Sequence, residues 1–255
     1  MEFLKDIYHI VLDYWPQLLR GVGNTMLIAL TGTVAGLLIG LLIGVLRTTP
    51  FSKIPVLRVL HKILNAICTV YVEVFRGTPM MVQAMVIYWG YAFATGGKTL
   101  ALIPSGIFIV SINTGAYMAE SVRGGIISVD PGQMEGAKAI GMTHVQAMLK
   151  VILPQAFRNI IPQIGNNFII NIKDTSVLSV ISIVDLFFVH KSVAGALYTY
   201  FESATIVMCI YLTMTLVSSR LLALWERKLD GDDNYELVDV MDIGNQMRVS
   251  GRGRA

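Results

Sequence analysis

The chain has 255 residues, of which 54% are hydrophobic and only 15% are charged, and its mean hydropathy is +0.63. These values exclude an ordinary soluble globule and are typical of a protein that crosses a membrane several times. The net charge of +3 is too small to indicate nucleic acid as a partner. The basic residues gather in loops, where they set membrane orientation. The two cysteines, Cys68 and Cys209, form no disulfide framework or metal-ligand spacing.

Residues 1–22 form the first predicted unit. They lack the basic start and uninterrupted apolar run of a signal peptide, because charged residues interrupt them up to Asp13. We expect an amphipathic segment that lies at the membrane interface, with Tyr14 and Trp15 as anchors.

The first predicted span is Asn24–Leu46, which contains no charged residue and is long enough to cross a bilayer. Four glycines recur in it at every fourth position: Gly32, Gly36, Gly40 and Gly44. On a helix with 3.6 residues per turn they form a nearly straight groove. Small residues let a neighbouring helix approach closely, so we expect helix packing here. Contact with a substrate is the less favoured alternative.

The next segment is ambiguous. Residues 56–75 carry several polar and charged side chains, too many for a helix that faces lipid throughout. We interpret them as an amphipathic helix that enters the membrane obliquely, breaks at Arg76-Gly-Thr-Pro79 and continues as residues 80–94. Such a break is tolerated only where backbone groups are buried in protein or meet water.

Three further spans are predicted at about 103–127, 160–184 and 204–225. On the first of them Asn113, Tyr117 and Glu120 share one face, and on the second a stripe of Gln163, Asn167, Asn171 and Asp174 does the same. A charged group at the bilayer centre costs about 2.5–3.5 kcal/mol, so these stripes must face a cavity or each other. We favour a substrate path along them, and the alternative is a hydrogen-bond network that holds the helices together. For Glu120 we expect a structural ion pair with Arg123.

Between the third and fourth spans lies a compact elbow. Residues 133–140 and 143–152 are predicted as two short helices with Gly141 between them and Pro154 closing the second, because glycine tolerates sharp turns and proline stops a helix. Such an elbow between membrane spans is a docking element for something outside the membrane. An ordinary helical hairpin is the plainer alternative.

The basic residues alternate between loops if there are five spans. Three loops are basic, and they hold Arg47, Lys53, Arg58 and Lys62, then Arg123, Lys138, Lys150 and Arg158, then Arg220, Arg227 and Lys228. The two loops between them hold only Lys98 and Lys191. The N-terminus is then outside, and the elbow and the C-terminus are cytoplasmic. Residues 229–255 are polar and are predicted to be a disordered cytoplasmic tail.

No enzyme site is visible in the sequence. It contains no Gly-x-x-x-x-Gly-Lys-Ser/Thr phosphate loop. Its four histidines, at positions 9, 61, 144 and 190, show no nucleophile or metal pattern. We expect no catalytic residue, no metal ligand and no cofactor bound by this chain. If ATP drives its activity, the ATPase is another chain.

Several motifs together resemble the permease subunits of polar amino-acid ABC importers of the histidine/glutamine/arginine type. They are Leu19-Arg-Gly-Val-Gly-Asn-Thr25, Phe75-Arg-Gly-Thr-Pro79, Gly115-Ala-Tyr-Met-Ala-Glu-Ser-Val-Arg-Gly124, Leu153-Pro-Gln-Ala-Phe-Arg158 and Lys173-Asp-Thr-Ser176. To these the elbow adds Glu135-Gly-Ala-Lys-Ala-Ile-Gly141 and Val151-Ile-Leu-Pro154, which resemble the EAA loop of such permeases. Gly136 stands where alanine is usual and Val151 where isoleucine is usual.

The resemblance implies an all-α permease of the type I importer kind, with residues 23–228 as its transmembrane domain in the cell membrane. It implies a second permease subunit, a pair of ATPase subunits that hold ATP and Mg²⁺, and an extracytoplasmic amino-acid-binding protein. The loop residues expected to dock on the ATPase or to shape the loop are Glu135, Gly136, Ala137, Gly141, Val145, Met148, Leu149, Leu153 and Pro154. Glu135 is expected to fix the loop by capping or by pairing with a basic residue.

Two rival interpretations remain. An ion-coupled secondary transporter would use Asp174, Lys173 and Glu120 as a relay, but such folds usually show inverted repeats, and none is found. A scaffold subunit would bind an ATPase and pass no substrate, and only the polar stripe around Asn167 and Asn171 argues against it.

Overall fold

The computed structural model describes residues 2–50 and 54–230, so nearly all of the predicted tail at 229–255 lies outside the described residues. Every regular element in this part of the chain is helical, which confirms the all-α fold. The helices are α1 (Glu2–Thr48), α2 (Pro55–Gly77), α3 (Met80–Ala94), α4 (Leu102–Ile127), α5 (Pro131–Ala139), α6 (His144–Ala147), α7 (Leu153–Asp174), α8 (Leu186–Leu197) and α9 (Tyr200–Asp230). A π-helical turn, η1 (Met148–Ile152), precedes α7, and a 3-10 helix, η2 (Thr175–Ile181), follows it.

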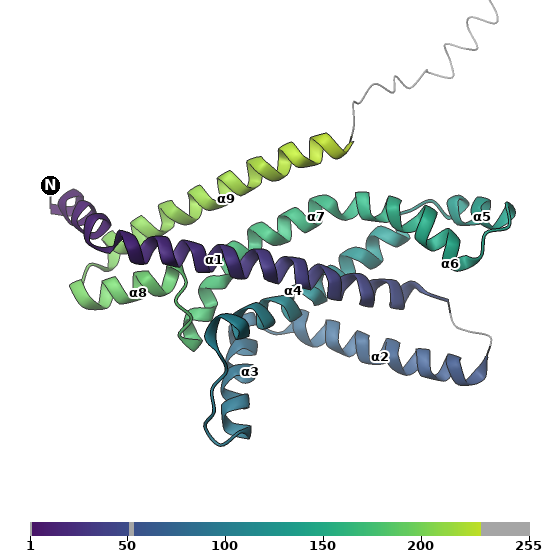
Figure 1. Ribbon diagram of the computed structural model, residues 1–255, viewed down its shortest axis with the longest axis horizontal. Coiled ribbons are helices and arrows are strands. Elements are labelled where there is room, and N and C mark those ends of the chain that lie inside the picture. Colours follow the sequence, from purple (N-terminus) through teal and green to yellow (C-terminus); the bar gives the residue numbers. More distant parts are fainter. Residues whose placement is uncertain (1, 51–53, 231–255) are drawn as a thin grey trace, which may run out of the picture.

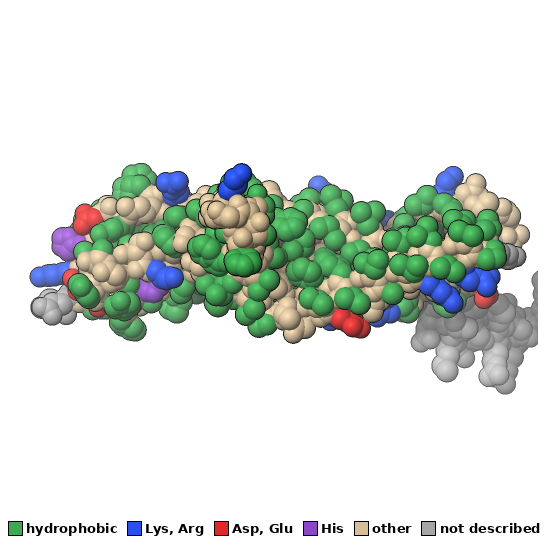
Figure 2. Space-filling model, turned by 90° about the horizontal axis from the view of Figure 1, so that it is seen from below, with side chains coloured by type: hydrophobic (Ala, Val, Ile, Leu, Met, Phe, Trp, Pro, Cys, Tyr) green, Lys and Arg blue, Asp and Glu red, His purple; other side chains and the backbone are tan. Residues whose placement is uncertain are grey.

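The long helices run side by side, and the two ends of the bundle differ. The N-terminus and α8 lie at one end, while α5 and α6 lie at the other (Figure 1). Hydrophobic side chains cover most of the face seen in Figure 2, as expected for helices that face lipid.

The described helices allow up to five membrane spans. Four are long and apolar enough to cross, namely Phe3–Thr48, Pro55–Gly77, Leu102–Ile127 and Tyr200–Glu226. The fifth is a pair, His144–Ile181 and Leu186–Leu197, bent by 51°.

The structure corrects the interpretation of residues 56–94. α2 is by itself long and apolar enough to cross a membrane, whereas α3 has 15 residues and stands across the long axis (Figure 1). The break falls at Thr78-Pro79, as predicted. Proline biases the residue before it towards extended backbone, and Thr78 has φ −125° and ψ 147°.

The segment 1–22 is helical and continues directly into the first predicted span. α1 runs without interruption from Glu2 to Thr48 with Pro16 inside it, and the helix bends near its start (Figure 1), as a proline inside a helix causes. Ile10 and Leu18 are buried in a cluster with residues of α8 and α9. Burial of these two side chains ties the segment to the bundle.

The glycine groove of α1 lies against α4. A Cβ added to any of the four glycines would collide with one side chain of α4. In the order Gly32, Gly36, Gly40 and Gly44, these side chains are Val110, Thr114, Met118 and Val122. These four residues also recur at every fourth position, so the two helices match along their whole contact. The groove therefore sets how closely α1 and α4 approach.

This close approach leads to a testable difference between two glycines of α1. At Gly40 a Cβ would lie 2.7 Å from the carbonyl carbon of Met118, whereas nothing lies within 4 Å of one at Gly23. Gly40→Ala should lower the free energy of unfolding by about 1–3 kcal/mol through overpacking. Gly23→Ala should leave it unchanged or raise it by up to about 1 kcal/mol, through helix propensity. Thermal melts of the purified protein compare the two. Equal melting temperatures would contradict the close packing.

The predicted span 160–184 is also corrected. α7 begins at Leu153 and ends at Asp174, and the chain tightens into η2 before α8 starts. α8 was not predicted. Asp185 is its N-cap and accepts hydrogen bonds from the backbone N–H groups of Phe187 (3.2 Å) and Phe188 (2.9 Å). An aspartate before Leu186-Phe-Phe is a helix-start signal that could have revealed it.

Candidate functional site

The elbow between α4 and α7 starts with a capped helix. Asp130 is the N-cap of α5, and its Oδ1 accepts a hydrogen bond from the backbone N–H of Gly132 at 2.7 Å. The cap is therefore Asp130, and not Glu135 as one expectation had it. Glu135 is exposed on α5, and no ion pair or hydrogen bond joins its carboxylate to another described residue.

The turn of the elbow is where the sequence placed it. Gly141 has φ +87°, a conformation that favours glycine, and α6 begins directly after the turn. Thr143 and Gln146 form a capping box, in which the Thr143 hydroxyl accepts from the Gln146 N–H and the Gln146 amide oxygen accepts from the Thr143 N–H. A fixed turn and a capped helix make the elbow a rigid unit.

Pro154 does not close the second helix, which is a correction to the sequence prediction. The helix widens into η1, where the N–H of Leu153 bonds to the carbonyl of Met148, and then continues as α7. A proline ring collides with the carbonyl four residues earlier in an α-helix, and a π-helical turn shifts the bonding by one residue. The elbow is thus continuous with α7.

Burial divides the predicted docking residues into two groups. Val145 and Leu149 are 63% and 60% exposed, whereas Met148 is 8% exposed. Met148 packs in a cluster with Val122 and Ile126 of α4. Met148 therefore holds the elbow to the bundle, whereas Val145 and Leu149 face outward. The remaining members of the set are the buried Ala137, the partly buried Leu153 and the exposed Gly136, Gly141 and Pro154.

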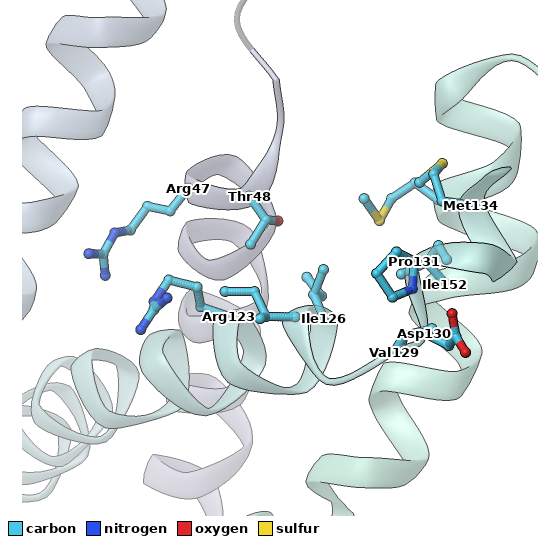
Figure 3. A pocket seen from close by; sticks show the side chains of 11 residues that line it. Arg47, Thr48, Arg123, Ile126, Val129, Asp130, Pro131, Met134 and Ile152 are labelled. Atoms are coloured by element: carbon cyan, nitrogen blue, oxygen red, sulfur yellow. The ribbon is translucent and has the colours of Figure 1, made fainter.

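A hollow of about 400 Å³ separates the elbow from the ends of α1 and α4. In Figure 3 the side chains of Met134, Pro131 and Ile152 lie on one side of it, with Thr48 and Ile126 opposite. Beside it Glu120 pairs with both Arg47 and Arg123, the second at 2.9 Å. Glu120 is thus in the predicted structural ion pair, and it joins α1 to α4.

A second cavity, of about 310 Å³, holds most of the predicted substrate path. Five of the six candidate residues line it, namely Asn113, Tyr117, Asn167, Asn171 and Asp174, together with Thr78, Pro79, Met80, Thr114 and Ile170. Gln163 is not among them. It is exposed one turn nearer the elbow, and its carbonyl accepts a hydrogen bond from the Asn167 amide. Asn167, Asn171 and Asp174 thus share one face of α7 that lines the cavity, and the cavity ends at Asn167.

The polar groups of this cavity fall into two kinds. Asn171 donates to the hydroxyls of Thr33 (2.8 Å) and Thr114 (3.0 Å), so it joins α7 to α1 and α4. Asn167 donates only within its own helix, to Gln163. Asn171 therefore belongs to a packing network, whereas Asn167 is free to meet a molecule in the cavity.

Three polar or turn-forming residues of the cavity were missed in the sequence. Thr78 and Pro79 come from the break between α2 and α3, and Thr114 lies beside Asn113 on α4. A polar break inside an apolar segment was a signal for the first two. Among the described residues, no group of three or more His, Cys, Asp or Glu side chains gathers as metal ligands would.

Comparison with known proteins identifies the family. The model of the family "Binding-protein-dependent transport system inner membrane component" matches residues 51–231. The L-cystine transport system permease protein TcyB of Bacillus subtilis (strain 168) is 36% identical over 223 residues, which are 86% of this chain and 88% of TcyB. The glutamine transport system permease protein GlnP of Escherichia coli (strain K12) is 35% identical, over 84% of this chain and 93% of GlnP.

Solved structures agree. The crystal structure of an amino acid ABC transporter with histidines includes a chain that is 38% identical, with a TM-score of 0.75, over 86% of this chain and 96% of that one. A chain of the MetNI methionine ABC transporter is 20% identical with a TM-score of 0.69, and this likeness shows the fold alone. The chain belongs to the family of inner membrane components of binding-protein-dependent transport systems.

Proposed function

We propose that this chain is the permease subunit of an ATP-driven importer and that it carries a polar amino acid across the cell membrane. The observation that carries the proposal is the polar cavity inside the bundle, where Asn113, Asn167 and Asp174 meet among apolar helices. Polar groups within a membrane-spanning bundle cost free energy unless they are hydrogen-bonded, so they are retained for structure or for contact with a substrate. The named functions of the relatives, cystine and glutamine transport, support an amino acid as the substrate.

The proposal includes three kinds of partner protein: an ATPase pair, a second permease and an extracytoplasmic binding protein. The elbow of α5 and α6 docks on one subunit of an ATPase pair, which holds ATP and Mg²⁺. Closure of that pair moves the elbow, and because η1 joins the elbow to α7, the motion reaches the cavity wall that carries Asn167. A second permease, either the same chain or a close relative, completes the path, and an extracytoplasmic binding protein delivers the amino acid.

The orientation is part of the proposal. The N-terminus lies outside the cell and the elbow lies in the cytoplasm. The alternation of basic and nearly neutral loops supports this, as does the separation of the N-terminus and the elbow at opposite ends of the bundle (Figure 1). The ATPase pair supplies the catalytic residues in this proposal. The task of this chain is to bind, enclose and release the substrate.

The experiment compares Asn167→Ala with Asn171→Ala. Uptake of labelled amino acids, counted per assembled transporter, is measured beside the melting temperature. Asn167→Ala should lower uptake per transporter at least about tenfold with little change in melting temperature, because the loss of one hydrogen bond to the substrate costs about 1.4 kcal/mol. Asn171→Ala should lower the free energy of unfolding by about 1–3 kcal/mol, because it leaves the buried hydroxyls of Thr33 and Thr114 short of a partner.

The outcomes separate the proposal from its rivals. Normal uptake per transporter in Asn167→Ala would remove the cavity from the path. A scaffold subunit would show no dependence of substrate preference on either residue. A sodium or proton relay through Glu120 and Asp174 would make uptake persist without ATP. Glu120 does not line the cavity that holds Asp174, which argues against that relay.

A further inference from the structure

Arg76 lies beside the polar cavity, in a motif to which the proposed function assigns no role. It occupies the last turn of α2, two residues before the break at Thr78-Pro79. Its side chain is exposed, and its Cζ lies 5.6 Å from the centre of the Tyr117 ring. Tyr117, Thr78 and Pro79 all line the cavity. Arg76 is therefore held at the mouth of the cavity by a cation–π contact with one of its walls.

The break that carries Arg76 is firmly held. Asn113 and Gln83 are buried, and Asn113 donates to the Gln83 side-chain oxygen at 2.9 Å. The Gln83 amide in turn donates to the carbonyls of Phe75 (3.0 Å) and Thr78 (2.9 Å). The last carbonyls of α2 are thus satisfied by α3 and α4. This network fixes the backbone on both sides of Arg76, so the position of the guanidinium is pre-organised.

The charges around the cavity are few. Asp174 is the only carboxylate among the lining residues, and two exposed cations, Arg76 and Lys173, stand within two residues of the lining in the chain. Among the described residues no ion pair joins Arg76 to Glu73 or to Asp174. α3 also begins at this wall without a side-chain cap, which adds partial positive charge near Met80.

We propose that Arg76 binds the α-carboxylate of the transported amino acid while Asp174 binds its ammonium group. This proposal rests on the proposed function. A guanidinium whose face rests on a ring still presents its N–H fork, and that fork matches a carboxylate. One cationic and one anionic group select a molecule with both charges, a zwitterion. The remaining lining carries no charge and mixes polar side chains, among them Asn167, Thr78 and Thr114, with the apolar Pro79, Met80 and Ile170, so it suits an uncharged side chain that can also form hydrogen bonds. The substrate class is a neutral, polar α-amino acid.

The test uses the purified complex of the permease with its ATPase, in detergent and without the binding protein. The twenty common amino acids are screened for a rise in melting temperature, and the Kd of the strongest is compared with those of its carboxyl amide and its N-acetyl derivative. Arg76→Gln should weaken binding of the free amino acid about ten- to hundredfold, because it removes a charge-assisted hydrogen bond. Binding of the carboxyl amide should change much less, because its neutral oxygen accepts only an ordinary hydrogen bond and makes no charge-assisted pair with the guanidinium. Asp174→Asn should do the reverse and remove the discrimination against the N-acetyl derivative.

Two further variants exclude a merely structural role. Arg76→Lys keeps the charge and should restore most of the preference for the free carboxylate. Lys173→Gln removes the other exposed cation near Asp174 and should leave both Kd values unchanged. The proposal is overturned if Arg76→Gln weakens the free acid and the amide equally, or if Lys173→Gln, rather than Arg76→Gln, removes the preference. If no amino acid binds the wild-type complex, the proposed function itself fails.

Discussion

Replacing both Val145 and Leu149 by glutamate is expected to abolish association with the ATPase while the permease still folds and inserts. The two side chains are 63% and 60% exposed, they lie about one helical turn apart, and they belong to the elbow, which lies at the opposite end of the bundle from the N-terminus (Figure 1). Exposed apolar residues on a rigid element are typical centres of a protein interface. Two carboxylates buried against the partner would each cost several kcal/mol. Co-purification and substrate-stimulated ATP hydrolysis measure the loss.

The matched control is the double variant Leu4→Glu and Tyr8→Glu. These side chains are 69% and 63% exposed with the same spacing, but α1 carries them at the opposite end of the bundle (Figure 1). They should not affect co-purification with the ATPase. Undiminished binding by the Val145 and Leu149 variant would contradict docking through this face. Equal loss in both pairs would indicate general damage to the fold.

Asp185→Ala should be the most destabilising single substitution considered for this chain, at about 2–4 kcal/mol. Asp185 is 0% exposed, and its carboxylate accepts hydrogen bonds from two backbone N–H groups of α8 and from the hydroxyl of Tyr211 on α9 at 3.1 Å. Alanine would leave these three partly buried donors without this partner. Beside it, Asn24 donates to the carbonyl of Val184, and Thr25 accepts from the N–H of Leu186. The carboxylate therefore lies where α1, α8 and α9 meet.

Asp130→Ala is the control for that substitution. Asp130 is also an N-cap, of α5, but it is exposed, and its one hydrogen bond to Gly132 can be replaced by water. Asp130→Ala should lower the free energy of unfolding by no more than about 1 kcal/mol. The thermal unfolding of the assembled transporter compares the two variants. A similar fall in melting temperature for both would show that the bonds to Tyr211 and to the buried end of α8 contribute little.

Local patterns in the sequence were enough to predict the class of protein, most of its helices and the position of the elbow. These properties follow from local rules. The length and hydropathy of a segment predict a crossing helix, glycine and proline mark breaks, and a four-residue glycine period predicts a close helix contact. The turn at Gly141, the break at Pro79 and the groove from Gly32 to Gly44 are all local patterns of this kind, and the structure has each of them.

The residues that each helix face contacts could not be predicted in this way. Periodicity places Asn167 and Asn171 on one stripe, but it does not say that Thr33 and Thr114 lie opposite Asn171. In the same way, an apolar spacing groups Met148 with Leu149, although α4 covers only Met148. Pro154 was misjudged because a π-helical turn can absorb a proline, and that turn is held by packing on α4. Neighbours come from segments far apart in the chain, so the contacts that separate a cavity wall from a packing network exist only once the helices have assembled.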